Sequence, residues 1–130
     1  MSRWTGHSAQ GMYDDYALLF ATLDKLQAAV IGDQQQPAAG LLLHEVAEYT
    51  SHHLASEEAI FAAAGLPGIV ERAAEDRNIT RQVAEYVALY EAGEISISIE
   101  FLDGLRNWLR AHIESTDRAY GPWIVRQRES

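Results

Sequence analysis

Apolar side chains recur every three or four positions along four separate stretches of the chain. This spacing is typical of amphipathic helices that face a common core. The predicted helices cover residues 12–31, 38–64, 69–92 and 97–120 to within a few positions. Four such helices joined by short connections predict an all-α fold, an antiparallel up-down-up-down four-helix bundle.

Turn-forming residues separate the four stretches. Residues 31–40 (IGDQQQPAAG) predict a connecting loop, and residues 65–68 (GLPG) predict a stop and turn after the second helix. Gly93 is expected to end the third helix, and residues 121–122 (Gly-Pro) the fourth. The ISISI stretch at 95–99 alternates like a strand, but a lone strand would have no partner, so it is interpreted as the start of the fourth helix.

Length and composition limit the class of protein. A chain of 130 residues that is 48% hydrophobic predicts a single domain over 1–130, with residues 1–11 as an N-terminal lead. The formal charge of −9, without a basic stripe, argues against nucleic acid or an anionic membrane as partner. The absence of cysteine excludes disulfides and thiolate metal sites. The start of the chain lacks a secretory pattern and no apolar run is long enough to span a bilayer, so we expect a soluble cytoplasmic protein.

Two helices carry histidine and carboxylate residues on their apolar stripes. His53 and Glu57 are four residues apart in the second helix, so they lie on one face and can reach one ion. His112 lies on the stripe of the fourth helix, and Asp117 follows five residues later. Because residues five apart point about 140° away from each other around the helix axis, this second pair would converge only at the lip of the core or across two ions.

Polar residues on the other two helices extend this set. The apolar stripe of the third helix favours Arg72 and Asp76 as its inward polar residues, whereas a shifted register would place Glu71 and Glu75 there. Tyr16 lies on the stripe of the first helix. We interpret it as a core tyrosine with a hydrogen-bond partner rather than as a phenolate ligand.

Several of these residues together are similar to the hemerythrin-like family, in particular to its bacterial members. The segments that carry the resemblance are Trp4, Tyr49, His53 and Glu57 with the glutamate after it, GLPG at 65–68, Leu105, Trp108-Leu109, His112-Ile113 and Asp117. The resemblance implies an antiparallel four-helix bundle that holds two non-haem iron ions and binds or senses dioxygen. It implies bridging roles for Glu57 and Asp117, and terminal metal-ligand roles for His53 and His112.

The chain departs from the family pattern at three metal-ligand positions, where Tyr16, Arg72 and Asp76 stand in place of histidines. With Glu57, Asp76 and Asp117 ionised and facing inward, one arginine leaves an excess of two negative charges. A single divalent ion with neutral histidines compensates for them, and so does a metal-free site in which both histidines are protonated. Two ferrous ions would add four positive charges and leave an excess of two positive charges in the site. We therefore expect an altered site that favours one ion over two.

Three hypotheses for function follow. The first is a non-haem iron-binding protein for dioxygen or another small diatomic ligand, with His53, Glu57, His112 and Asp117 as metal ligands and Asp76 and Tyr16 as candidates for additional ones. The second is a metal-free bundle in which Arg72 crosslinks the acids and the domain serves as an interaction or structural module. The third is a dioxygen-activating oxidase, although no catalytic residue stands out. The sequence leaves any protein partner open.

Overall fold

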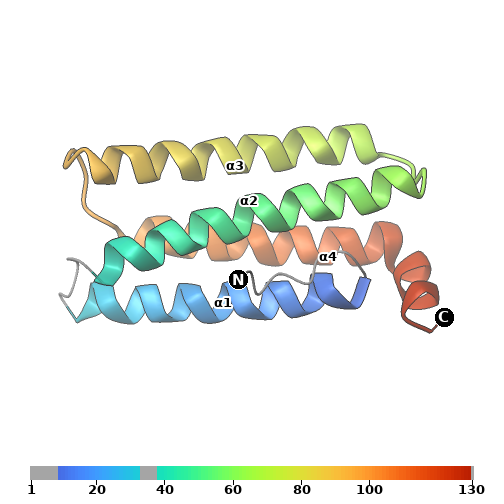
Figure 1. Ribbon diagram of the computed structural model, residues 1–130, viewed down its shortest axis with the longest axis horizontal. Helices are drawn as coiled ribbons and strands as arrows, with labels where there is room; N and C mark the ends of the chain where they lie inside the picture. The colour runs from blue at the N-terminus through green and yellow to red at the C-terminus, as the bar shows by residue number, and fades with distance from the viewer. Residues whose placement is uncertain (1–8, 33–37, 130) are drawn as a thin grey trace.

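The chain forms an antiparallel four-helix bundle, as the sequence predicts. The computed structural model describes residues 9–32 and 38–129, with side chains over 16–32 and 38–126. The helices are α1 (Ala9–Ile31), α2 (Gly40–Ala63), α3 (Ile69–Glu91) and α4 (Ile99–Glu129). Consecutive helices run in opposite directions along the long axis of the molecule (Figure 1). Most of the N-terminal lead expected for residues 1–11 lies outside the described residues, and α1 already begins at Ala9.

The four helices are not equally close to one another. α1 packs against α2 and α4, and α2 packs against α3. Between the described parts of α3 and α4, by contrast, no two Cα atoms lie within 8 Å of each other. The backbone of α3 is therefore attached to the bundle mainly through α2.

The core between the helices is built largely from leucine. Six leucines of this core, from three helices, are fully buried: Leu19, Leu23, Leu26, Leu43, Leu102 and Leu109. Val83 and Val87 of α3 join this cluster. Within the described ranges, no helix combines the length and the apolar character that crossing a membrane requires.

Left-handed glycines end α2 and α3, as predicted. After α2, Gly65 has a φ of 67°, its N–H donates to the carbonyl of Ala62, and the Leu66 N–H donates to that of Phe61. This pair of hydrogen bonds is the Schellman motif, in which a residue without Cβ is favoured at the left-handed position. Gly93, with a φ of 77°, has the same role after α3.

The ISISI stretch leads into α4, and its residues 95–98 precede the first helical residue, Ile99. α4 begins at Ile99, and the Ser98 hydroxyl accepts a hydrogen bond from the Phe101 N–H at 3.1 Å, which caps the helix. The Tyr86 hydroxyl of α3 accepts from the Ser98 N–H at 2.9 Å and donates to the Ser96 carbonyl at 3.1 Å. These bonds take the place of a strand partner.

The prediction that Gly121 and Pro122 end the fourth helix is wrong. α4 continues through both residues to Glu129, and its last turns bend away from the bundle axis (Figure 1). A proline inside a helix removes one backbone hydrogen bond and bends the helix. Here the residues beyond it are held by packing, because Ile124 is buried in a small cluster with Phe61 and Tyr120.

Candidate metal centre

Glu57 lies at the centre of a buried polar cluster. It is one turn after His53 on the inward face of α2, and the two side chains are only 2% and 1% exposed. The His53 Nε2 atom lies 3.3 Å from Glu57 Oε2. The prediction that His53 and Glu57 form an inward pair on α2 is therefore confirmed.

Two further helices contribute hydrogen bonds to the same carboxylate. His112 Nε2 of α4 lies 2.7 Å from Glu57 Oε1, and the Tyr16 hydroxyl of α1 donates to Glu57 Oε2 at 2.9 Å. The rings of Tyr16 and His53 also pack together, with centroids 3.9 Å apart. The expectation that Tyr16 is a hydrogen-bonded core tyrosine agrees with this arrangement.

The charge state of this network follows from its contacts. Burial alone would raise the pKa of Glu57, but the hydrogen bonds from His112 and His53 lower the pKa to about 2, so the carboxylate is ionised at neutral pH. Burial, and next the charge of Glu57, hold the pKa of Tyr16 well above its ordinary value. Tyr16 is therefore a neutral phenol whose hydroxyl donates a hydrogen bond to the carboxylate.

Asp76 of α3 lies beside His112 on the side of the ring away from Glu57. Its Oδ1 atom is 3.7 Å from His112 Nδ1, which is beyond hydrogen-bond distance, and it has no hydrogen-bond partner among the described residues. The residue is 4% exposed. Burial raises the pKa of Asp76 to about 7, with the negative charge of Glu57 adding to the rise and the nearby His112 opposing it. A buried carboxylate oxygen without a partner is rare, because it loses its hydration without compensation.

The register of α3 is the one that its apolar stripe favours. Asp76 is buried and Arg72 is half-buried, whereas Glu71 and Glu75 of the alternative register are both exposed.

The metal-free hypothesis expected Arg72 to crosslink the acids, but the hydrogen bonds of its side chain go to hydroxyl groups. Its guanidinium donates to the Ser115 hydroxyl at 2.9 Å and to the Thr116 hydroxyl, and it lies over the Tyr120 ring at 5.2 Å. Among the described residues, none of its hydrogen bonds goes to a carboxylate. Arg72 precedes Asp76 by one turn, and at that level α4 presents two hydroxyls and an aromatic face.

Asp117 is exposed, so the structure does not bring it to Glu57 and the two buried histidines. The inward position one turn after His112 is Thr116, which is 4% exposed. One turn before His112, the Trp108 ring stacks on the imidazole, with centroids 4.9 Å apart and planes 10° apart. Neither residue was predicted as a neighbour of His112, although the spacing of four residues that paired His53 with Glu57 would have indicated both.

Three buried residues place donor atoms close enough together to hold a metal ion. Glu57, Asp76 and His112 each offer one ligand atom, and these three atoms lie within 4.8 Å of one another. Two carboxylates and an imidazole are ligands that suit iron, manganese or zinc, and the unpartnered Asp76 oxygen is available to coordinate such an ion. Arg72, one turn before Asp76 in α3, provides a guanidinium, which cannot coordinate a metal.

A four-helix bundle with carboxylate and histidine side chains from facing helices defines a class of metal-binding bundle proteins. The hemerythrin HHE cation binding domain family matches residues 12–124, and the chain belongs to this family. It is thus a hemerythrin-like cation-binding protein.

Two bacterial relatives are similar to this chain. A bacteriohemerythrin of Stenotrophomonas maltophilia (strain R551-3) is 37% identical over 90 residues, which cover 69% of this chain and 58% of that protein. A bacteriohemerythrin of Methylococcus capsulatus (strain ATCC 33009 / NCIMB 11132 / Bath) is 26% identical over 112 residues, which cover 85% of this chain and 84% of that protein. The first match therefore spans less than two thirds of the relative's length. No solved structure matches the chain.

Proposed function

We propose that this protein binds a single divalent transition-metal ion through Glu57, Asp76 and His112. The observation that carries the proposal is that the buried Asp76 Oδ1 atom has no hydrogen-bond partner among the described residues. A carboxylate oxygen of Asp76 also lies within 4.8 Å of ligand atoms of Glu57 and His112. The family resemblance favours iron as the ion. This set of ligands differs from the one that the resemblance implies, because Asp76 takes the place of the exposed Asp117.

Charge supports one ion over two. Glu57 and Asp76 bring two negative charges into the interior when both are ionised, and one divalent ion compensates for them. Burying such charges without compensation would cost several kcal/mol or force protonation. A second ion would add two more positive charges beside Arg72, at the side of the cluster where the chain already holds a guanidinium.

The same resemblance suggests dioxygen or another small diatomic molecule as the physiological ligand. When bound, the ion would supply an open coordination position for such a molecule. The protein's own residues would orient the ligands and exclude water. Tyr16 holds Glu57 through a hydrogen bond of 2.9 Å, and the Trp108 ring fixes the plane of the His112 imidazole. His53 borders the same carboxylate and is a candidate for a further metal ligand.

Metal titration tests the proposal. We expect the purified metal-free chain to take up about one equivalent of Fe²⁺ under anaerobic conditions. Asp76→Asn should weaken binding at least ~10-fold, because even residues that only support a metal ligand typically contribute that much. Asp103→Asn removes the same charge from an exposed position of α4 and is the matched control. Absence of bound metal at any ratio, or equal affinity of the Asp76→Asn variant, would contradict the proposal.

One observation favours the metal-free alternative. The carboxylate of Glu57 already has hydrogen-bond partners on Tyr16, His53 and His112, so this part of the cluster is satisfied without a cation. A folded chain that binds no transition metal in the titration would support a structural or interaction module instead.

A further inference from the structure

A groove of about 440 Å³ lies between α2 and α3 and reaches the candidate metal centre. Polar and charged side chains line much of it: Ser51, Glu58, Asp76, Arg77, Thr80 and Arg81. Asp76 therefore belongs both to this groove and to the cluster with Glu57 and His112. No other residue of the three-membered cluster lines the groove.

Asp76 lines the groove, and its carboxylate also carries an unpartnered oxygen that is buried beside His112. Asp76 is 4% exposed, and its Oδ1 atom has no hydrogen-bond partner among the described residues. Glu57, by comparison, has a partner on each of its two oxygens. A buried carboxylate that lacks a partner and borders a groove is a binding position for a cation that arrives through that groove.

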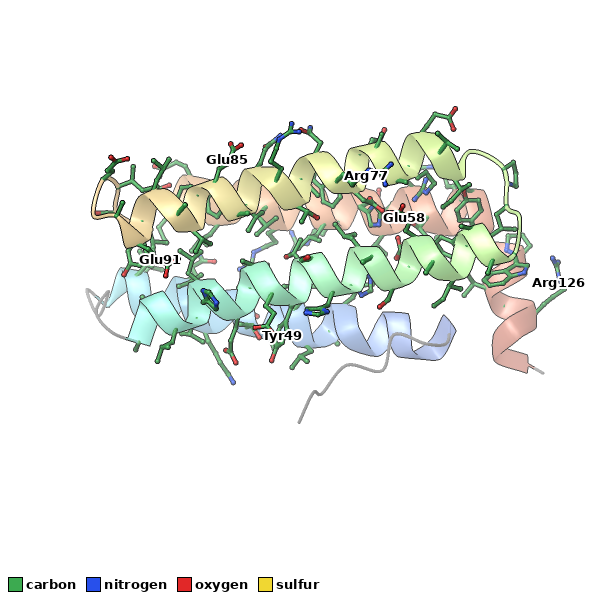
Figure 2. All side chains as sticks on the ribbon, turned by 45° about the horizontal axis from the view of Figure 1, so that its top comes forward. Tyr49, Glu58, Arg77, Glu85, Glu91 and Arg126 are labelled. Atoms are coloured by element: carbon green, nitrogen blue, oxygen red, sulfur yellow. The ribbon has the colours of Figure 1, made fainter. Side chains whose placement is uncertain are left out.

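A second carboxylate lies nearer to solvent. Glu58 follows Glu57 in α2, and its side chain is 29% exposed. Its Oε1 atom accepts a hydrogen bond from Arg77 Nη1 at 3.0 Å, and the Arg77 side chain is 67% exposed. Figure 2 shows Glu58 on α2 and Arg77 on α3 facing each other between the two helices. This ion pair therefore connects the two walls of the groove.

We propose that the α2–α3 groove is the path by which a hydrated divalent cation reaches Asp76, and that Glu58 is the first carboxylate it meets. This inference rests on the proposed function. In the metal-free protein Arg77 neutralises Glu58. Because an ion pair this exposed contributes little free energy, an arriving cation can replace Arg77 as the partner of Glu58 and then pass inward to Asp76. Glu58 and Arg77 act on the passage of the ion and are not ligands of the final site.

A substitution that narrows the groove shows whether the groove is a path for the ion or its binding site. Ala55 of α2 lines the groove and is exposed, so Ala55→Phe places a large side chain in it without disturbing the core. We expect both the uptake of Co²⁺ and its release to a chelator, measured by stopped-flow absorbance on the full chain, to slow by ~10-fold. The dissociation constant should stay the same, because a barrier changes the two rates together. Ala59→Phe, one turn later on the exposed side of α2, is the matched control.

Removing the ion pair tests its role directly. Arg77→Gln should speed Co²⁺ uptake by up to about five-fold, the size of effect expected for an exposed ion pair. Glu58→Gln should slow it. Arg110→Gln and Glu114→Gln make the same charge changes at exposed positions of α4 and should leave the rates nearly unchanged.

The outcomes are distinguishable. A chain that takes up no Co²⁺ or Fe²⁺ at equilibrium would overturn both the proposed function and the path. Normal affinity with rates that do not respond to Ala55→Phe would overturn the path alone. So would slowing by Gly104→Phe instead, because Gly104 lines a different hollow, between α3 and α4, where an added Cβ meets no atom within 4 Å.

Discussion

Glu57 holds side chains of three helices through its two carboxylate oxygens. Oε1 contacts His112 of α4, and Oε2 contacts His53 of α2 and Tyr16 of α1. Two buried atoms beside it have no hydrogen-bond partner among the described residues, Oδ1 of Asp76 in α3 and Nδ1 of His53 in α2. At the residue scale, the carboxylate of Glu57 is therefore compensated, whereas the carboxylate of Asp76 is not.

The unpartnered Asp76 gives the metal-free protein a specific dependence on pH. Its pKa in the folded state is about 7, raised from an ordinary value of 3.8. Between these values the folded protein binds more protons than the unfolded chain, so this residue makes stability fall as pH rises from about 4 to about 7. A shift of three pKa units corresponds to up to about 4 kcal/mol.

Urea denaturation of the metal-free protein across this pH range measures the effect. Asp76→Asn, which cannot ionise, should lose less stability than the wild type between pH 4 and pH 7. Glu57 contributes in the opposite direction, because its lowered pKa gives stability that is lost as pH falls below about 4 toward 2. Stability curves that run parallel for the wild type and Asp76→Asn above pH 4 would contradict this account.

Helical periodicity predicted the inward position of His53, Glu57, Asp76 and His112, because burial of a helical residue follows from its angle around the axis. It did not predict where the Arg72 side chain would point. A long, flexible arginine can reach several partners from one backbone position, and its partners here are set by the level of α4 that faces it. The ligand role of Asp117 came from the resemblance and stays a prediction.

At the scale of the element, the ends of α2 and α3 were predictable because a local hydrogen-bond motif sets them. Gly65 and Gly93 occupy left-handed positions that few other residues adopt, and both helices end within two residues of the predicted positions. The end of α4 was not predictable in this way. Pro122 is a strong local signal for a stop, but packing of Ile124 in a cluster that includes Phe61 of α2 overrides it.

Alanine substitutions at two glycines test the role of local backbone conformation, because they are expected to change stability in opposite directions. An added Cβ meets no atom within 4 Å at Gly93 or at Gly104, so packing contributes little to either substitution. Gly93→Ala places alanine at a φ of 77° and should destabilise the fold by about 1 kcal/mol or more. Gly104→Ala lies within α4 and should stabilise it by about 0.5–1 kcal/mol. Urea titration of both variants measures their free energies of unfolding. If the two substitutions change this free energy in the same direction, backbone conformation alone does not determine their effects.

At the scale of the whole molecule, the class of fold was predictable because four apolar stripes with short connections have few alternative arrangements. The spacing between the helices was not. Nothing in the pattern of α3 indicates that its backbone stays more than 8 Å from that of α4 over the described residues. That distance depends on the side chains that meet between the two helices, including Arg72 with Ser115.

The attachment of α3 through a single neighbouring helix has a consequence for motion. Its backbone is close only to that of α2, whereas α1 and α2 each lie close to two helices, so the amide hydrogens of α3 should exchange with deuterium faster than those of α1 and α2. A cation bound by Asp76 and His112 would join α3 to α4 and slow this exchange. Hydrogen–deuterium exchange of α3 in the presence and absence of Fe²⁺ would therefore report occupancy through protection of the backbone, without any spectroscopic signal from the ion itself. Equal protection of α3 in both states would show that this helix is held by other means.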